Sequence, residues 1–140
     1  MDLSYLITPF FAWLVTGGVK FVVNTIKEKR LAFDLVGYGG MPSNHSSIVS
    51  SAVAIIAFNE GFQEPALVVA LALAFIVMLD ANSLRQQIGK HAKAINKLNS
   101  CNDVQQLRER MGHTRFEILA GIISGISSAS IVHYFFTTIA

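Results

Sequence analysis

The chain has 140 residues, of which 52% are hydrophobic and 14% are charged, and its formal net charge is +2. Because soluble domains average about 25% charged residues, this composition excludes an ordinary soluble domain and indicates a single membrane-embedded domain, 1–140. The one cysteine, Cys101, excludes an internal disulfide framework.

Four apolar segments predict an all-α integral membrane protein with about four transmembrane helices. The expected spans are approximately 3–26, 46–58, 66–82 and 116–139. The first and last are long enough to cross a hydrocarbon core, which needs about 20 helical residues. The middle two cross it only if their polar ends also lie at membrane depth. The polar stretch from Asp80 to Met111 is expected to be a helical segment outside the membrane.

Basic residues are concentrated on one side of this arrangement. Apart from Lys20, which lies within the first span, every lysine and arginine falls in the segments 27–45 and 80–115. The opposite side, which holds both termini and the turn 59–65, has acidic residues only. Because cytoplasmic loops are enriched in lysine and arginine, the basic side is predicted to face the cytoplasm from the inner or plasma membrane. Nucleic-acid binding is not expected, because the basic residues follow the membrane side.

A loop rich in glycine, proline and serine precedes the second span and carries a histidine. It reads Gly39-Gly40-Met41-Pro42-Ser43-Asn44-His45-Ser46-Ser47. Glycine and proline allow a sharp turn that exposes N–H groups, and a helix start leaves N–H groups unpaired at the positive end of its dipole. These features predict an anion site, typically for phosphate, with His45 placed to protonate a leaving oxygen. The alternative is a helix cap with an incidental histidine.

A second histidine has a carboxylate at helical spacing. His113 and Glu117 are four residues apart, so on a helix they share one face and can pair. A carboxylate on one imidazole nitrogen fixes the tautomer and makes the other nitrogen a better nucleophile or base. The alternative is an ordinary surface pair just outside the membrane.

Several charged groups lie on the same side as the two histidines. Lys20 and Asp80 are at membrane depth, where ionisable residues usually face a partner, a cavity or a site. The alternatives are that they neutralise each other, or that Asp80 pairs with Arg85. Arg85 and Arg108 offer forked donors for phosphate oxygens. The remaining lysines of this region are expected to bind anionic headgroups; they are Lys90, Lys93 and Lys97.

Three blocks in a fixed order resemble a known family. They are GGMPSNHS at 39–46, VMLDA at 77–81 with Arg85 after it, and GHT at 112–114 with Glu117 after it. Together they resemble the small divergent membrane branch of the type-2 phosphatidic acid phosphatase and vanadium haloperoxidase superfamily. The resemblance covers nearly the whole chain.

The resemblance implies a role for each matching residue. His113 corresponds to the nucleophile that takes the phosphoryl group, Glu117 to the residue that orients it, and His45 to the group that protonates the leaving oxygen and later activates water. Lys20 corresponds to the phosphate-binding lysine, and Ser43 with its loop backbone to the phosphate cradle. The expected substrate-binding set also includes Asn44, Arg85, Arg108 and Asp80.

The chain departs from the family pattern at three positions. Asn44 replaces the usual glycine of the loop, and Glu117 replaces an aspartate. Leu107 occupies the position of an arginine, which leaves Arg108, one residue on, or Arg85 to supply that charge.

Association of two copies is also expected. Larger members of the superfamily have about six spans against four here, so a homodimer would complete the bundle. Gly121 and Gly125 form a small-xxx-small pattern in the fourth span, which signals a close helix contact either within the bundle or across a dimer.

The sequence therefore predicts a membrane-embedded phosphatase that hydrolyses a lipid phosphate or diphosphate through a phosphohistidine intermediate, without metal or cofactor. One alternative is a catalytically degenerate protein that binds phosphate or lipid, and another is a scaffold. A transporter is disfavoured, because four short spans without a repeat leave little room for alternating access. A vanadate-dependent oxidase is disfavoured because no halide pocket is evident.

Overall fold

The computed structural model describes residues 3–31, 40–98 and 105–139, and every regular element in these ranges is a helix. The elements in chain order are α1 (Ser4–Glu28), α2 (Asn44–Glu60), α3 (Pro65–Leu79), a π turn (Asp80–Leu84), α4 (Arg85–Leu98) and α5 (Arg115–Ile139). Three helices are long and apolar enough to cross a membrane: Ser4–Glu28, Pro65–Leu98 and Arg115–Thr138. These findings confirm an all-α integral membrane protein.

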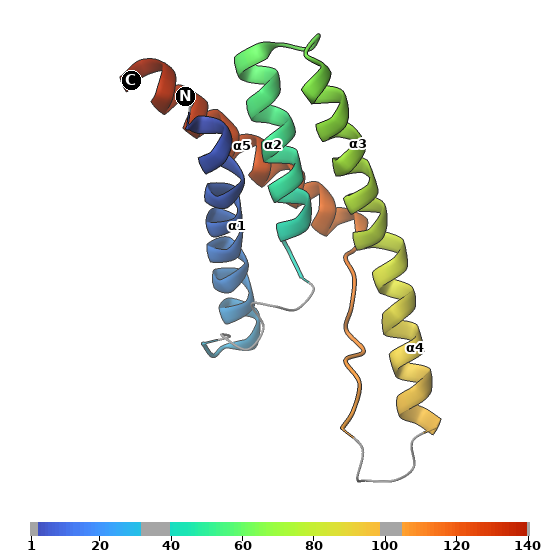
Figure 1. Ribbon diagram of the computed structural model, residues 1–140. Coiled ribbons are helices and arrows are strands. Elements are labelled where there is room, and N and C mark those ends of the chain that lie inside the picture. Colours follow the sequence, from blue (N-terminus) through green and yellow to red (C-terminus); the bar gives the residue numbers. More distant parts are fainter. Residues whose placement is uncertain (1–2, 32–39, 99–104, 140) are drawn as a thin grey trace.

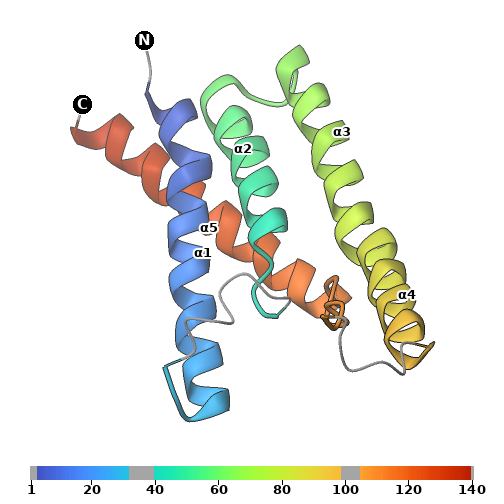
Figure 2. The ribbon, with the colours of Figure 1, turned by 60° about the horizontal axis from the view of Figure 1, so that its bottom comes forward.

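The remaining expected span, α2, is the central helix of the bundle. It has 17 residues, or about 25 Å of helix against a hydrocarbon core of about 30 Å. It packs against α1, α3 and α5, and Figure 1 shows it between α1 and α3, with α5 slanting behind. Both chain termini lie at one end of the bundle with the turn after α2, whereas the starts of α2 and α5 lie near the other end (Figure 2).

The polar segment after the third span differs from the single helix expected there. The helix ends at Leu98, and residues 105–110 form an extended segment that returns alongside α4 (Figure 1). The Asn96 side chain holds this segment: its Nδ2 donates to Leu107 O (2.8 Å), and Leu107 N donates to its Oδ1 (2.9 Å). Gly89 permits the close approach, because a Cβ there would lie 2.5 Å from Glu109 O. Cys101 lies outside the described residues.

The interior of the bundle is polar. One buried stripe of α1 recurs every four residues, which places its members on one helix face; it consists of Ser4, Thr8, Ala12, Thr16, Lys20 and Asn24. Thr16 Oγ1 donates to Ser47 Oγ on α2 (2.7 Å) and lies 2.7 Å from Ser124 Oγ on α5. In a lipid environment small residues and hydroxyl groups hold helices together, because lipid tails remove the hydrophobic driving force.

The two glycines of the small-xxx-small pattern lie inside the bundle. A Cβ on Gly121 would meet Ser43 O at 2.4 Å, and one on Gly125 would meet Ser50 Oγ at 2.2 Å. This pattern therefore brings α5 against the start of α2 within one chain. Of the two locations that the sequence left open, the structure uses the intramolecular one.

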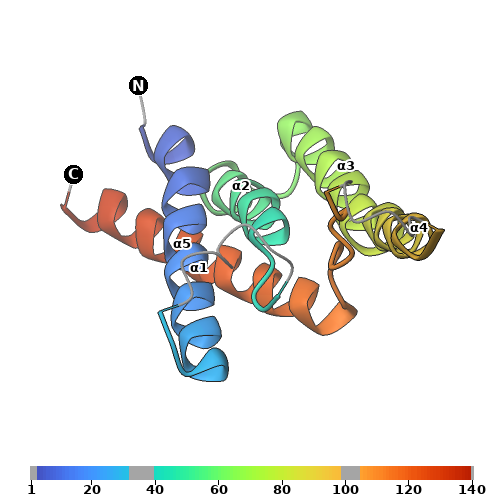
Figure 3. The ribbon, with the colours of Figure 1, turned by 90° about the horizontal axis from the view of Figure 1, so that it is seen from below.

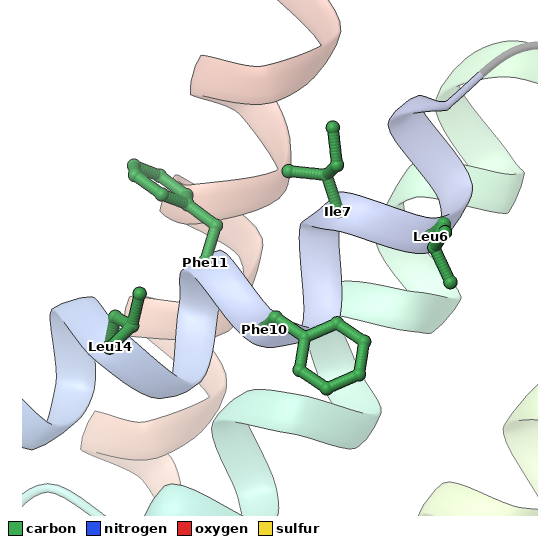
Figure 4. A pocket seen from close by; sticks show the side chains of 5 residues that line it. All are labelled: Leu6, Ile7, Phe10, Phe11 and Leu14. Carbon is green, nitrogen blue, oxygen red and sulfur yellow. The ribbon is translucent and has the colours of Figure 1, made fainter.

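Large apolar side chains cover the outside of the bundle. Figure 4 shows five of them around a shallow hollow, and all five belong to α1: Leu6, Ile7, Phe10, Phe11 and Leu14. None carries a polar group that would orient a substrate, so this hollow is part of the lipid-facing surface.

Candidate active site

The histidine–carboxylate pair lies at the N-terminal end of α5. Glu117 Oε2 lies 3.2 Å from His113 Nδ1 and accepts the Thr114 N–H at 3.0 Å, while Glu117 N–H donates to Thr114 Oγ1 at 3.3 Å. The two bonds between Thr114 and Glu117 form a capping box, in which threonine and glutamate satisfy each other's backbone N–H groups at a helix start. Glu117 thus caps α5 and orients an imidazole with one carboxylate. The spacing of His113 and Glu117 predicted their pairing, whereas the capping box, whose signal is Thr114-x-x-Glu117, was not predicted.

The π turn and the first turn of α4 fix the backbone of the same histidine. His113 N–H donates to Ala81 O (2.9 Å), and Gln86 Nε2 donates to His113 O (2.9 Å). Gly112 has φ +86°, and a Cβ on it would lie 2.7 Å from Gln86 Cγ, so both conformation and space require glycine there. Sequence reasoning missed Gln86 as a positioning residue, because its partner is 27 residues away.

The second histidine opens α2 and faces the first. The ring centroids of His45 and His113 are 5.9 Å apart, with an interplanar angle of 59°. Asn44 Oδ1 and His45 Nδ1 are buried, and neither has a hydrogen-bond partner in the described part of the chain. The first turn of α2 therefore contains two buried polar atoms without a described partner, and one of them belongs to the ring that faces His113.

Ser43 joins the two helix starts. It is fully buried, its N–H donates to Glu117 O (3.0 Å), and its Oγ accepts from Ser46 Oγ (3.1 Å) at the N-cap of α2. Since its N–H and hydroxyl are used within the protein, Ser43 places the loop. The next N–H groups, those of Asn44 and His45, are the first of α2 and point out of a helix N-terminus. Gly39 lies outside the described residues.

Two cations accompany the histidines. Lys20, only 2% exposed on α1, and Arg85, after the π turn, both interact electrostatically with His45 and His113. Arg85 Nε also donates to Asp80 Oδ2 at 3.0 Å. The pairing of Asp80 with Arg85 is the alternative that the sequence left open for this carboxylate.

Arg108 lies elsewhere. It follows Leu107, whose backbone is hydrogen-bonded to the Asn96 side chain. At a rise of 1.5 Å per residue, Asn96 lies about 16 Å further along α4 than Arg85. Between the two arginines named as alternatives, the structure therefore brings Arg85 to the histidines and leaves Arg108 on the returning segment.

The environment of His113 favours its neutral form. Burial of the ring lowers its pKa below the ordinary value, and the positive charge of Lys20 lowers that pKa further, while the hydrogen bond to Glu117 opposes both effects. A neutral imidazole whose Nδ1 faces a carboxylate carries its lone pair on Nε2, which is the atom needed for nucleophilic attack.

No three His, Cys, Asp or Glu side chains within residues 3–31, 40–98 and 105–139 lie close enough together to hold a metal ion.

Comparison with known proteins gives a family and one relative. The sequence model of the Divergent PAP2 family matches residues 1–128. The chain is 30% identical to YuiD of Bacillus subtilis (strain 168), described as an uncharacterized membrane protein, over 152 aligned positions that cover 96% of this chain and 94% of that protein. No solved structure matches the chain.

Proposed function

The chain belongs to the Divergent PAP2 family, and from this premise we propose that it is a membrane phosphatase acting on a lipid phosphate or diphosphate. The observation that carries the proposal is the pair of the buried His113 and the partly buried Glu117, with the His45 ring 5.9 Å from that of His113. Lys20 and Arg85 supply positive charge at the same place. Together these groups match what phosphoryl transfer needs: a nucleophile, an acid and charge stabilisation.

The proposed reaction has two steps. His113 Nε2 attacks phosphorus in line, a nitrogen–phosphorus bond forms, and the bond from phosphorus to the leaving oxygen breaks as His45 protonates that oxygen. His45, now neutral, takes a proton from water, which attacks phosphorus and breaks the nitrogen–phosphorus bond to release phosphate. Lys20, Arg85 and the N–H groups at the start of α2 stabilise the charged phosphoryl oxygens.

The location of the site suggests a lipid substrate. The starts of α2 and α5 and the end of α3 meet at the end of the bundle from which α4 projects (Figure 2). A headgroup reaches the histidines there while its tails remain in the bilayer. Because the basic residues gather on this side, we place the site on the cytoplasmic face.

Phosphate release by the purified protein in detergent tests the proposal. The substrates are phosphatidic acid, phosphatidylglycerophosphate and an isoprenyl diphosphate, each with and without a chelator. We expect the protein to release phosphate at the same rate with and without the chelator. The relative rates for the three substrates would show which headgroup is preferred. Absence of release from all three would favour a degenerate phosphate-binding protein. The observation for this alternative is Asn44, which replaces the usual glycine and whose buried Oδ1 has no partner among the described residues.

The pH profile reports the nucleophile. Since His113 attacks only when unprotonated and its pKa is held below the ordinary value of about 6.5, the acid limb of kcat/KM is expected to lie below that value. Lys20→Met removes a charge that lowers this pKa, so the acid limb should move to higher pH. Glu117→Gln keeps the capping box but removes a charge that raises the pKa, so the limb should move to lower pH. Equal profiles for all three proteins would contradict the assignment.

An apolar cavity of about 330 Å³ is suited to a hydrocarbon tail. It lies between α2, α3 and α5 and extends from Met78, two residues before Asp80, to Phe62 beyond α2. Ala57→Phe fills its distant end. Excluding two methylene groups costs about 1.6 kcal/mol, so KM for a long-chain substrate should rise about tenfold while that for p-nitrophenyl phosphate stays unchanged. Val69→Phe, on the exposed side of α3, is the control, and an equal effect on both substrates would argue against a tail in this cavity.

A further inference from the structure

An apolar stripe continues along α4 beyond the membrane bundle. Leu84, Ile88, Ile95 and Leu98 are 57%, 44%, 48% and 83% exposed, and the exposed His91 completes the series. The steps between them alternate between four and three residues, which is the heptad spacing that keeps side chains on one face of a supercoiled helix.

The stripe lies in a polar setting. α4 carries lysine at positions 90, 93 and 97 and continues the line of α3 away from the bundle (Figures 1 and 3). We therefore place it in water rather than flat on the bilayer. The returning segment covers a different side of α4, which it contacts through Gly89 and Asn96. An apolar stripe left open in water marks an interaction surface.

The residue types on the stripe indicate that its partner is a second, parallel copy of the same helix. Ile88 and Ile95 occupy heptad position a, and Leu84, His91 and Leu98 occupy position d. β-branched residues at a with leucine at d favour two parallel strands. Two copies of one membrane protein insert with the same orientation, so their α4 helices are necessarily parallel.

The flanks of the stripe do not oppose self-association. The flanking positions hold Gln87, Ala92 and Ala94, which are uncharged, and Arg85, whose charge is paired with Asp80. The lysines of α4 occupy the outer heptad positions. Like charges at the flanking positions would repel a second copy. The only charged residue at these four positions is Arg85, and its charge is paired with Asp80.

The exposed stripe continues into the membrane on α3. There it consists of Val68, Ala72, Phe75 and Leu79. The step from Leu79 to Leu84 is five residues long and crosses the π turn, whose i→i+5 hydrogen bonds take one more residue per turn than an α-helix. The π turn therefore keeps both halves of the stripe on nearly the same side of one continuous helix.

We propose that two copies of this chain pair through α3 and α4, and that α4 forms a parallel two-stranded coiled coil with His91 facing its counterpart. The glycine pattern of α5, for which the sequence left a contact within the bundle or across a dimer open, is used within each chain, so the dimer contact is assigned to the α3–α4 stripe. The pairing does not depend on phosphatase activity.

Disulfide trapping in membranes tests the pairing on the full-length chain. In a Cys101→Ser background, Ile88→Cys and Ile95→Cys place a thiol on the stripe, and Lys93→Cys places one on the outer side of the same helix as a matched control. Mild oxidation is expected to yield at least tenfold more covalent dimer from the stripe variants than from the control. Equal yields, or no dimer from either stripe variant, would overturn the proposal and indicate that another protein or the membrane surface covers the stripe.

The mass of the purified protein in detergent gives a second readout. Wild type is expected to be a dimer, Ile88→Asp with Ile95→Asp a monomer, and Lys93→Asp a dimer. His91→Leu should raise the dimer fraction at low protein concentration, because a polar residue at a core heptad position lowers stability. A wild-type monomer, or a dimer that persists in the double aspartate variant, would overturn the proposal.

Discussion

Replacing His113 with alanine is expected to abolish phosphate release, with a fall in kcat/KM of at least about 10³-fold. In the proposed reaction its Nε2 forms the bond to phosphorus, and the described side chains around it supply no other nucleophile held by a carboxylate. The initial rate of phosphate release from the best lipid substrate measures the effect.

Two controls separate this result from a loss of folding. Lys93→Ala changes an exposed side chain on α4, outside both the site and the apolar stripe, and should retain the wild-type rate. The thermal unfolding midpoint of His113→Ala should stay close to that of wild type, because Glu117 continues to cap α5 through Thr114. Normal turnover by His113→Ala would refute the phosphohistidine mechanism.

Replacing His45 with asparagine is expected to reduce release from a lipid phosphate by about 10²–10⁴-fold, the usual contribution of a general acid. The defect should depend on the leaving group. An alcohol of high pKa needs the proton from His45, whereas p-nitrophenol leaves without it. Comparing kcat/KM for a lipid phosphate and for p-nitrophenyl phosphate in the same variant measures this difference.

The same variant should accumulate the intermediate. Without His45 to activate water, hydrolysis of phospho-His113 becomes the slow step, so p-nitrophenol should appear in a burst equal to the enzyme concentration. Acid-labile labelled phosphate should remain on the protein. A similar defect with both substrates and no burst would assign His45 a purely structural role at the start of α2.

Hydropathy was sufficient to predict the helices, because a long apolar run has few stable alternatives to a helix in lipid. It was not sufficient for the polar region between Leu79 and Arg115. A solvated helix and an extended segment have the same polar composition, and the bonds between Asn96 and Leu107 join residues far apart in the chain. The helix after the third span therefore ends earlier than the sequence predicts.

The site could be predicted in part. Spacing alone indicated the pair of His113 and Glu117, because four residues make one helical turn. Membrane depth pointed to Lys20 as a residue that faces the interior. The choice between Arg85 and Arg108 needed the fold, since both lie in one polar segment and only the turn of the chain after α4 separates them.

Two different helical elements hold His113 in place, one through its backbone and the other through its ring. Its backbone is bonded to Ala81 in the long rod Pro65–Leu98, and its ring is held by Glu117 on α5. A slide of the rod against α5 by about one ångström would turn the imidazole out of line, and misplacements of that size are costly in catalysis. The alignment of the nucleophile therefore depends on how two membrane helices pack against each other. A change in bilayer thickness, to which helices can respond by tilting, is expected to alter that alignment.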